Sequence, residues 1–168
     1  MSYSEGDVAE FGCFRGGSTA ILSMACALAG KRLFVFDSFQ GVPTDMEYTM
    51  GNKRMSRHYQ RRTYSAPLSQ TQQTVKDYGC PDAVVWVPGF FKDTLPVQHD
   101  PERLCMVYVD VDVPLSQVEA FAFFWPKLIS GGCLFSDESK VACTYQTYGE
   151  QSNRLKSLFE GVGYVFKD

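Results

Sequence analysis

The sequence lacks the features that mark membrane proteins and most nucleic-acid-binding proteins. No apolar run approaches the length of a membrane span, and the first residues have neither the basic nor the apolar region of a signal peptide. The net charge is only −3, so the composition predicts neither a nucleic-acid-binding field nor an acidic tail. We therefore expect no membrane partner and no nucleic-acid partner.

Paired cysteine motifs are also missing. The six cysteines are spread along the chain without a CxxC pair, which argues against a zinc site. Most of them lie in apolar segments, where free cysteine packs as a small hydrophobe. This usage is typical of a reducing compartment and predicts a cytoplasmic protein. The two histidines, His58 and His99, follow no predicted strand, and no serine or cysteine has the surroundings of a catalytic nucleophile.

The residues that are present suit one soluble domain of 168 residues. Residues 6–19 predict a buried strand that ends at Glu10 and Phe11, a turn, and the start of a helix over about 18–29. Ser18 or Thr19 is expected to cap that helix. An acidic residue beside such a turn suits a nucleoside cofactor better than a bare phosphate. The turn contains three glycines, which let the backbone pass close to a ligand: Gly12, Gly16 and Gly17.

A second strand is predicted at residues 33–37, where a continuous apolar run ends in Asp37. Continuous apolar character indicates burial on both faces, as in a parallel sheet. The acid lies about 20 residues beyond the glycines, where a ribose-binding carboxylate is expected. Strand, glycine turn, helix, strand and acid together outline a nucleotide-binding βαβ unit.

The rest of the chain continues the alternation of helices and strands. Ser69 is expected to cap the helix that follows residue 67. Helices are predicted at 68–78, at 115–129 with a bend or interruption near Pro126, and at 148–159. Strands are predicted at 83–87, 103–110, 133–136 and 161–167. This order predicts an α/β fold, a Rossmann-like, doubly wound and mostly parallel sheet of six strands.

Residues 40–66 interrupt this pattern. Their second part, residues 51–64, is basic, aromatic and weakly patterned. Long loops in compact domains are often lids or binding loops, so we predict a lid or substrate loop here. A solvated insertion fits the same composition equally well.

Acidic residues follow several of the predicted strands at the edge where α/β sheets bind ligands. Asp110, Asp137 and Glu138 follow two strands that we expect to be neighbours. Carboxylates that meet in a cleft repel one another and call for a cation or a proton. All-oxygen ligation suits Mg²⁺. Alternatively, Asp137 or Glu138 caps the next segment, and Asp112 is either a fourth ligand or a helix cap.

Five ordered segments resemble motifs of the macrocin O-methyltransferase family, which are class I enzymes that use S-adenosylmethionine to methylate sugar hydroxyls of natural products. They are residues 6–18, 36–43, 89–96, 109–112 and 131–138. The resemblance implies a single methyltransferase domain over residues 1–168 and a small-molecule hydroxyl acceptor, such as a sugar.

The resemblance also implies roles for individual residues. Glu10 and the turn backbone would take the methionine end of the cofactor, Asp37 the ribose, and Phe90 or Phe91 the adenine. Asp110, Asp137 and Glu138 would bind Mg²⁺ beside the acceptor hydroxyl, and Asp110 would be the general base. The implied cofactor-binding set is Glu10, Phe11, Gly12, Cys13, Gly16, Gly17, Ser18, Asp37, Ser38, Phe90 and Phe91.

The sequence departs from the family pattern in several places. Glu138 replaces the second aspartate of the family's pair, and residues 113–115 replace a tyrosine-containing turn. The first strand begins almost at residue 1, and six strands are expected where seven are usual, so we expect a sheet that is minimal or truncated at both ends. The site would then be closed by residues 40–66 or by another subunit of a homo-oligomer.

Two alternative functions stay open, one from these departures and one from a resemblance of residues 107–113 to another motif. The first is a degenerate cofactor-binding domain without catalytic activity. The second is a phosphatase-like hydrolase with an Asp-x-Asp motif, in which Asp110 would be the nucleophile and Asp112 the acid–base. The second leaves the first 40 residues unexplained, because that motif normally closes the first strand of its domain.

Overall fold

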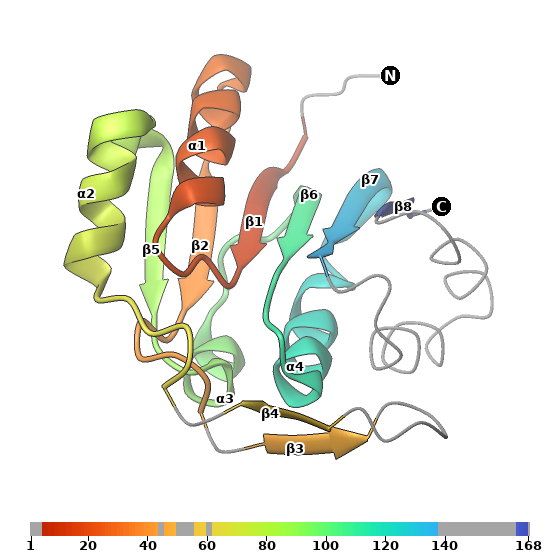
Figure 1. Cartoon of the computed structure of the whole chain (residues 1–168). Coiled ribbons are helices and arrows are strands. Elements are labelled where there is room, and N and C mark those ends of the chain that lie inside the picture. The colour runs from red at the N-terminus through yellow and green to blue at the C-terminus, as the bar shows by residue number, and fades with distance from the viewer. Residues whose placement is uncertain (1–4, 44–45, 50–55, 60–61, 138–163, 168) are drawn as a thin grey trace.

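A twisted sheet of six strands forms the centre of the computed structural model, which describes residues 5–43, 46–49, 56–59, 62–137 and 164–167. The strand order is β5-β2-β1-β6-β7-β8 (Figure 1). Every neighbouring pair is parallel except β7 and β8, which are antiparallel. This confirms the predicted mostly parallel α/β sheet. The strands are β1 (Asp7–Phe11), β2 (Leu33–Asp37), β5 (Val84–Pro88), β6 (Leu104–Val109), β7 (Leu128–Ser136) and β8 (Tyr164–Phe166).

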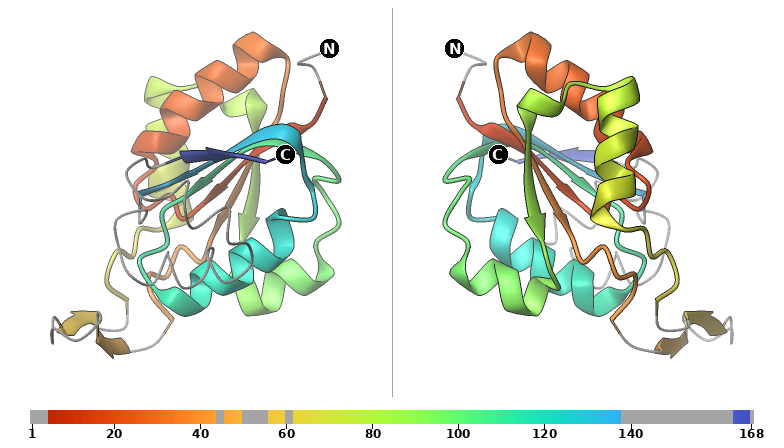
Figure 2. Two further views of the ribbon diagram at one scale, coloured as in Figure 1. Left: turned by 90° about the vertical axis from the view of Figure 1, so that its right-hand side faces the viewer. Right: turned by 90° about the vertical axis from the view of Figure 1, so that its left-hand side faces the viewer.

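Helices cover both faces of the sheet, which gives three layers (Figure 2). One face carries α1 (Gly17–Ala29) and α2 (Leu68–Tyr78), and the other carries α3 (Phe91–Thr94) and α4 (Pro114–Phe124). Short 3₁₀ turns, η1 (Pro81–Ala83) and η2 (Leu95–Val97), lead into β5 and follow α3. Among the described residues, no helix has the length and apolar character needed to cross a bilayer.

Phenylalanines fill the core where the central strands end. Phe11 and Phe36, on adjacent strands, are fully buried and stack with ring centroids 4.7 Å apart. Phe124 of α4 packs against Phe11 at 5.6 Å from the opposite layer. Because Phe11 directly precedes Gly12, this packing fixes the point at which the chain leaves the sheet to form the glycine turn.

The boundary between α4 and β7 differs from the prediction of a helix over 115–129. The helix ends at Phe124, and the strand begins at Leu128, well before the predicted residue 133. The predicted interruption near Pro126 is present, because proline has no N–H and cannot continue a helix, but the chain beyond it forms a strand and not a second piece of helix. The Lys127 carbonyl accepts a hydrogen bond from Leu104 N at 2.8 Å, and the pairing of β6 with β7 starts at this bond.

The predicted bounds of α2 are confirmed, but its predicted cap is wrong. The helix spans Leu68–Tyr78, and Pro67 occupies the position before it without a side-chain cap. Ser69 lies inside the first turn, so its hydroxyl is not at the position from which side chains cap a helix. The predicted helix at 148–159 lies outside the described residues.

Residues 40–66 contain regular structure that the sequence did not predict. β3 (Met46–Thr49) and β4 (Ser56–Tyr59) form a separate antiparallel pair, which projects from the body of the fold (Figures 1 and 2). At its base, Val42 N donates to Thr63 O at 3.1 Å and Arg62 N donates to Val42 O at 3.2 Å. The role of this hairpin as a lid stays a prediction.

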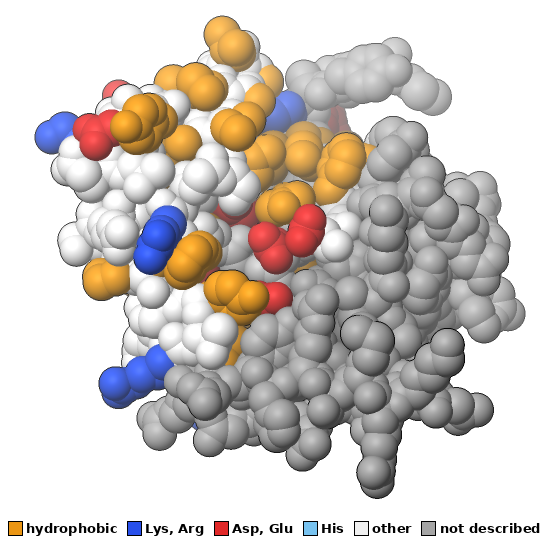
Figure 3. All heavy atoms as spheres, viewed as in Figure 1, with side chains coloured by type: hydrophobic (Ala, Val, Ile, Leu, Met, Phe, Trp, Pro, Cys, Tyr) orange, Lys and Arg blue, Asp and Glu red, His pale blue; other side chains and the backbone are white. Residues whose placement is uncertain are grey.

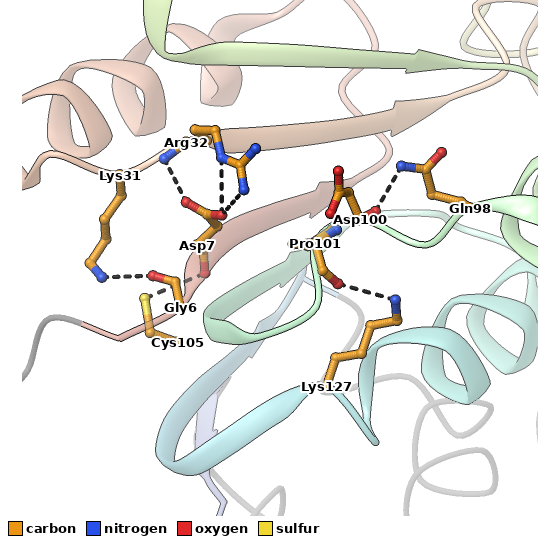
Figure 4. A network of polar contacts seen from close by, with 9 residues as sticks. All are labelled: Gly6, Asp7, Lys31, Arg32, Gln98, Asp100, Pro101, Cys105 and Lys127. Atoms are coloured by element: carbon orange, nitrogen blue, oxygen red, sulfur yellow. Dashed lines mark hydrogen bonds and ion pairs between the residues drawn. The ribbon is translucent and has the colours of Figure 1, made fainter.

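A polar network fastens the opposite end of the sheet, where β1 and β2 begin (Figure 4). The Arg32 side chain pairs with Asp7 at 2.8 Å, and Lys31 Nζ donates to Gly6 O at 2.7 Å. On the neighbouring connection, Lys127 Nζ donates to the carbonyls of His99 and Pro101. These contacts hold the amino ends of the strands, so the network lies away from the edge where ligands are expected.

Candidate functional site

A cavity of about 540 Å³ lies where the parallel strands end. Acidic side chains gather near the centre of the face shown in Figure 3, with apolar side chains beside them. The cavity is built by the turn after β1, the segment after β2, the segment before α2, the start of α3, the segment from β6 into α4, and the end of β7. Its lining residues are Gly12, Cys13, Phe14, Arg15, Gly17, Ser18, Asp37, Ser38, Gly41, Val42, Pro43, Tyr64, Phe90, Phe91, Asp110, Val111, Asp112, Val113, Ser116 and Asp137.

Most of the predicted site residues come together in this cavity. Those that line it are Gly12, Cys13, Gly17, Ser18, Asp37, Ser38, Phe90, Phe91, Asp110 and Asp137. Three others do not: Glu10 and Phe11 are fully buried, and Gly16 packs against α2. Glu138 lies outside the described residues.

The turn after β1 needs glycine for steric reasons at two positions. Gly12 has φ 82°, and a Cβ added there would lie 1.9 Å from the carbonyl oxygen of Asp110. Gly16 also has φ 82°, and its Cβ would meet Thr71 Cγ2 at 2.8 Å. The Thr71 hydroxyl then donates to Phe14 O at 2.9 Å, which fastens the turn to α2. The glycines therefore bring the turn against its neighbours while one side stays open to the cavity.

The Asp37 carboxylate joins the end of β2 to the glycine turn. Its Oδ2 atom accepts hydrogen bonds from the backbone N–H groups of Cys13 at 2.8 Å and Phe14 at 3.3 Å. Its Oδ1 atom accepts a bond from Phe39 N at 2.7 Å. Each oxygen has further acceptor capacity, and Asp37 lines the cavity, so it can hold the turn and still accept bonds from a ligand.

Glu10 lies beneath the turn and is fully buried. Its two oxygens accept hydrogen bonds from the hydroxyls of Ser18, at 2.5 Å, and Thr19, at 2.6 Å. The prediction that one of these hydroxyls caps the helix is therefore wrong. The helix begins at Gly17, with Gly16 at the cap position and no side-chain cap. Burial raises the pKa of Glu10 to about 7, although the two hydroxyl bonds act in the opposite direction.

Three carboxylates form an acidic wall on the β6–β7 side of the cavity: Asp110, Asp112 and Asp137. Burial, together with the nearby charges of Asp137 and Asp112, raises the pKa of Asp110 to about 6. Asp112 has φ 57°, and Val113 N donates to Val111 O across it at 2.5 Å, which makes a tight turn. Backbone strain of this kind concentrates at functional sites.

Two of the three predicted magnesium ligands, Asp110 and Asp137, lie in the acidic wall, and magnesium binding stays a prediction. Hard cations prefer carboxylate oxygens, and Asp110 and Asp137 lie close enough for their charges to interact. Within the described part of the chain, no group of three side chains is arranged to hold a metal ion. The third predicted ligand, Glu138, is not among these residues.

Two aromatic residues of the cavity were not predicted as site residues. Phe14 and Tyr64 meet edge to face with ring centroids 5.7 Å apart, and they are 39% and 47% exposed. Both have positive φ, 46° and 60°. The Arg15 guanidinium lies 5.0 Å from the centre of the Phe14 ring. Tyr64 belongs to the basic, aromatic segment noted in the sequence, but only the fold shows that it reaches the glycine turn.

The chain is similar to known proteins in both sequence and fold. A sequence model of the macrocin O-methyltransferase family matches residues 3–159. The chain belongs to this family. The resemblance carried by the five motifs is thereby confirmed, and nothing favours the Asp-x-Asp hydrolase.

Two of the proteins that this chain resembles are O-methyltransferases. A Streptomyces olivaceus protein, 8-demethyl-8-(2,3-dimethoxy-alpha-L-rhamnosyl)-tetracenomycin-C 4'-O-methyltransferase, is 32% identical over 82% of this chain and 55% of its own length. Mycinamicin III 3''-O-methyltransferase of Micromonospora griseorubida is 30% identical over 89% of this chain and 61% of its own. The chain thus spans little more than half the length of these relatives.

Solved structures support the fold. The O-methyltransferase NovP superposes with a TM-score of 0.73 at 24% identity, covering 98% of this chain and 72% of NovP. CalS11, a calicheamicin methyltransferase, gives a TM-score of 0.64 at 21% identity, covering 88% of this chain and 65% of its own. These likenesses confirm the class I methyltransferase architecture.

Proposed function

We propose that the chain is an S-adenosylmethionine-dependent O-methyltransferase, or the cofactor-binding core of one, that acts on a hydroxyl of a small molecule such as a sugar of a natural product. One observation carries this proposal: the chain belongs to the family, and a single cavity in it is lined both by the glycine turn after β1 and by the acidic wall. Residues far apart in the sequence, such as Asp37 and Asp137, line the same space.

The cofactor would occupy the side of the cavity formed by the glycine turn and β2. Asp37 and Ser38 would hold the ribose, the Gly12–Gly17 backbone the methionine end, and Phe90 or Phe91 the adenine. Bound S-adenosylmethionine supplies a sulfonium methyl group that is already a strong electrophile. The protein therefore needs mainly to align the acceptor oxygen with that group, and the fastened turn suits this task.

The acceptor hydroxyl would lie at the acidic wall. Asp110, Asp137 and Glu138 would hold Mg²⁺, which lowers the pKa of a hydroxyl bound to it. Asp110 would take the hydroxyl proton as general base. Without a bound cation the pKa of Asp110 is raised to about 6, so the carboxylate is ionised near neutral pH and available both to a cation and to a proton.

We also propose that the β3–β4 hairpin closes over the acceptor. Gly41, Val42 and Tyr64 stand at the base of the hairpin and line the cavity. A second copy of the chain is the other source of such a cover. Deleting residues 46–59 distinguishes the two covers, because the deletion removes the hairpin but leaves a contact with a second subunit in place.

Methyl transfer tests the proposal directly. The chain is incubated with S-adenosylmethionine and simple sugar glycosides, with Mg²⁺ or with a chelator, and the products are analysed by mass spectrometry. We expect a methylated glycoside with Mg²⁺, and a loss of at least about 100-fold in Asp110→Asn, the scale of a lost general base. Asp82→Asn, an exposed carboxylate on η1, is the matched control.

The non-catalytic alternative gives a different result in the same experiment. It predicts cofactor binding but no methylated product with any glycoside. Activity that is unchanged by chelation would remove the magnesium ion from the proposal and leave the cofactor site intact.

A further inference from the structure

We propose that Glu10 binds no ligand itself and is a positioning residue that orients the Ser18 hydroxyl toward the cationic amino group of the cofactor. This inference rests on the proposed function. It differs from the role implied by the family resemblance, in which Glu10 takes the methionine end of the cofactor directly.

The geometry separates Glu10 from the cavity. Its exposed fraction is 0%, and it does not line the cavity. Its Oε1 atom accepts the bond from Ser18 and its Oε2 atom the bond from Thr19. Thr19 is also fully buried, whereas Ser18 is half-buried and lines the cavity. Ser18 is therefore the member of this cluster that can touch both Glu10 and a ligand.

A serine hydroxyl has one proton and two acceptor lone pairs. Because Ser18 donates its proton to ionised Glu10, it offers lone pairs to the cavity, and lone pairs suit an ammonium group. If Glu10 were protonated, its own O–H would need an acceptor, and Ser18 would be free to donate instead. The charge of Glu10 thus decides whether Ser18 accepts or donates.

The charges around Glu10 favour the same ligand. Asp37 at the end of β2 and Asp110 after β6 face it, and both carboxylates disfavour its ionisation. The Cys13 thiol of the turn faces it too, but burial raises the pKa of that thiol, so it stays neutral. An ammonium group of the ligand at Ser18 would place a positive charge near the carboxylates of Glu10, Asp37 and Asp110. That charge would favour the ionised form of Glu10 and so lower its pKa.

Calorimetric titration with S-adenosylhomocysteine between pH 6 and 8.5 tests the inference. We expect the affinity of the wild-type chain to rise with pH, because binding lowers the pKa of Glu10 and releases its proton. The total rise in affinity should be tenfold for each unit by which binding lowers that pKa. Glu10→Gln should keep binding but show a flatter profile. The difference between the two profiles reports the ionisation of Glu10 together with its electrostatic coupling to Asp37 and Asp110.

Two serine variants separate positioning from simple stability. Ser18→Ala should weaken binding and flatten the pH profile as Glu10→Gln does. Ser23→Ala is the matched control on the same helix: its buried hydroxyl donates to Ala20 O and accepts from Cys80 N, away from Glu10. It should lower the melting temperature without changing the pH profile of binding.

The outcomes are distinct. Equal pH profiles for the wild-type chain and Glu10→Gln, or for the wild-type chain and Ser18→Ala, would overturn the inference. Loss of binding at every pH in a folded Glu10→Gln protein would overturn it as well, because it indicates direct contact. No binding by the folded wild-type chain would instead refute the proposed function.

Discussion

The buried carboxyl of Glu10 should make the protein less stable as the pH rises, and Glu10→Gln should remove that effect. Its pKa is raised from an ordinary 4.5 to about 7 in the folded chain. A carboxyl with a raised pKa binds its proton more tightly in the folded state. The stability that it contributes is therefore present at pH values below 4.5 and is lost as the pH rises through 7.

The size of the effect follows from the two pKa values. At about 1.36 kcal/mol per pKa unit, the gap between them amounts to about 3 kcal/mol when Glu10 is fully ionised. That is a large part of the roughly 5–15 kcal/mol that stabilises a typical domain. Glutamine has the shape of protonated glutamate and carries no charge, so we expect Glu10→Gln to be more stable than the wild-type chain at pH 8 by a similar amount.

Urea denaturation followed by circular dichroism at pH 5 and pH 8 measures the effect. The gap between the two proteins should be small at pH 5 and about 2–3 kcal/mol at pH 8, with unchanged m-values. Glu102→Gln, at an exposed position, is the control and should change stability by less than about 0.5 kcal/mol. If Glu10→Gln were less stable than the wild-type chain at pH 8, the idea that the ionised Glu10 carboxylate destabilises the fold because it is buried without a compensating positive charge would be refuted.

Two further predictions concern the glycine turn. Gly12→Ala should cost at least about 3 kcal/mol, because it adds backbone strain and a Cβ 1.9 Å from the Asp110 carbonyl oxygen. Gly30→Ala, with φ 65° but open space around it, should cost only about 1 kcal/mol in the same urea assay; equal costs would contradict the role of close packing. Thr71→Val should cost about 1–2 kcal/mol, since it removes the bond to Phe14 O inside a buried site. It should also weaken binding of S-adenosylhomocysteine several-fold by calorimetry, and unchanged affinity would show that this bond does not shape the site.

Much of the fold could be predicted because its signals are local. Residues 33–37 form a continuous apolar run, and the structure makes them β2 with the same bounds. Asp37 ends this strand and reaches the cavity, as the distance from the glycines suggested. Such features depend on burial and backbone geometry, which leave a pattern along the chain.

The failures arise where a contact between distant residues overrides a local rule. Ser18 and Thr19 have the residue type of helix caps, yet their hydroxyls donate hydrogen bonds to a buried carboxylate of β1 instead. Tyr64 lines the site only because the segment after the hairpin packs against Gly41. The early start of β7 follows from Pro126 together with pairing to β6. Sequence spacing alone does not show which partner is nearest in space.

Cofactor binding tests the central claim most directly. S-adenosylhomocysteine is titrated calorimetrically into the wild-type chain and into Asp37→Asn, which keeps the size of the side chain but loses one carboxylate oxygen and its charge. We predict saturable binding of one molecule per chain, weakened at least about tenfold by Asp37→Asn, the scale of a lost charge-assisted hydrogen bond. The absence of binding to the folded wild-type chain, or equal affinity in the two proteins, would contradict this account.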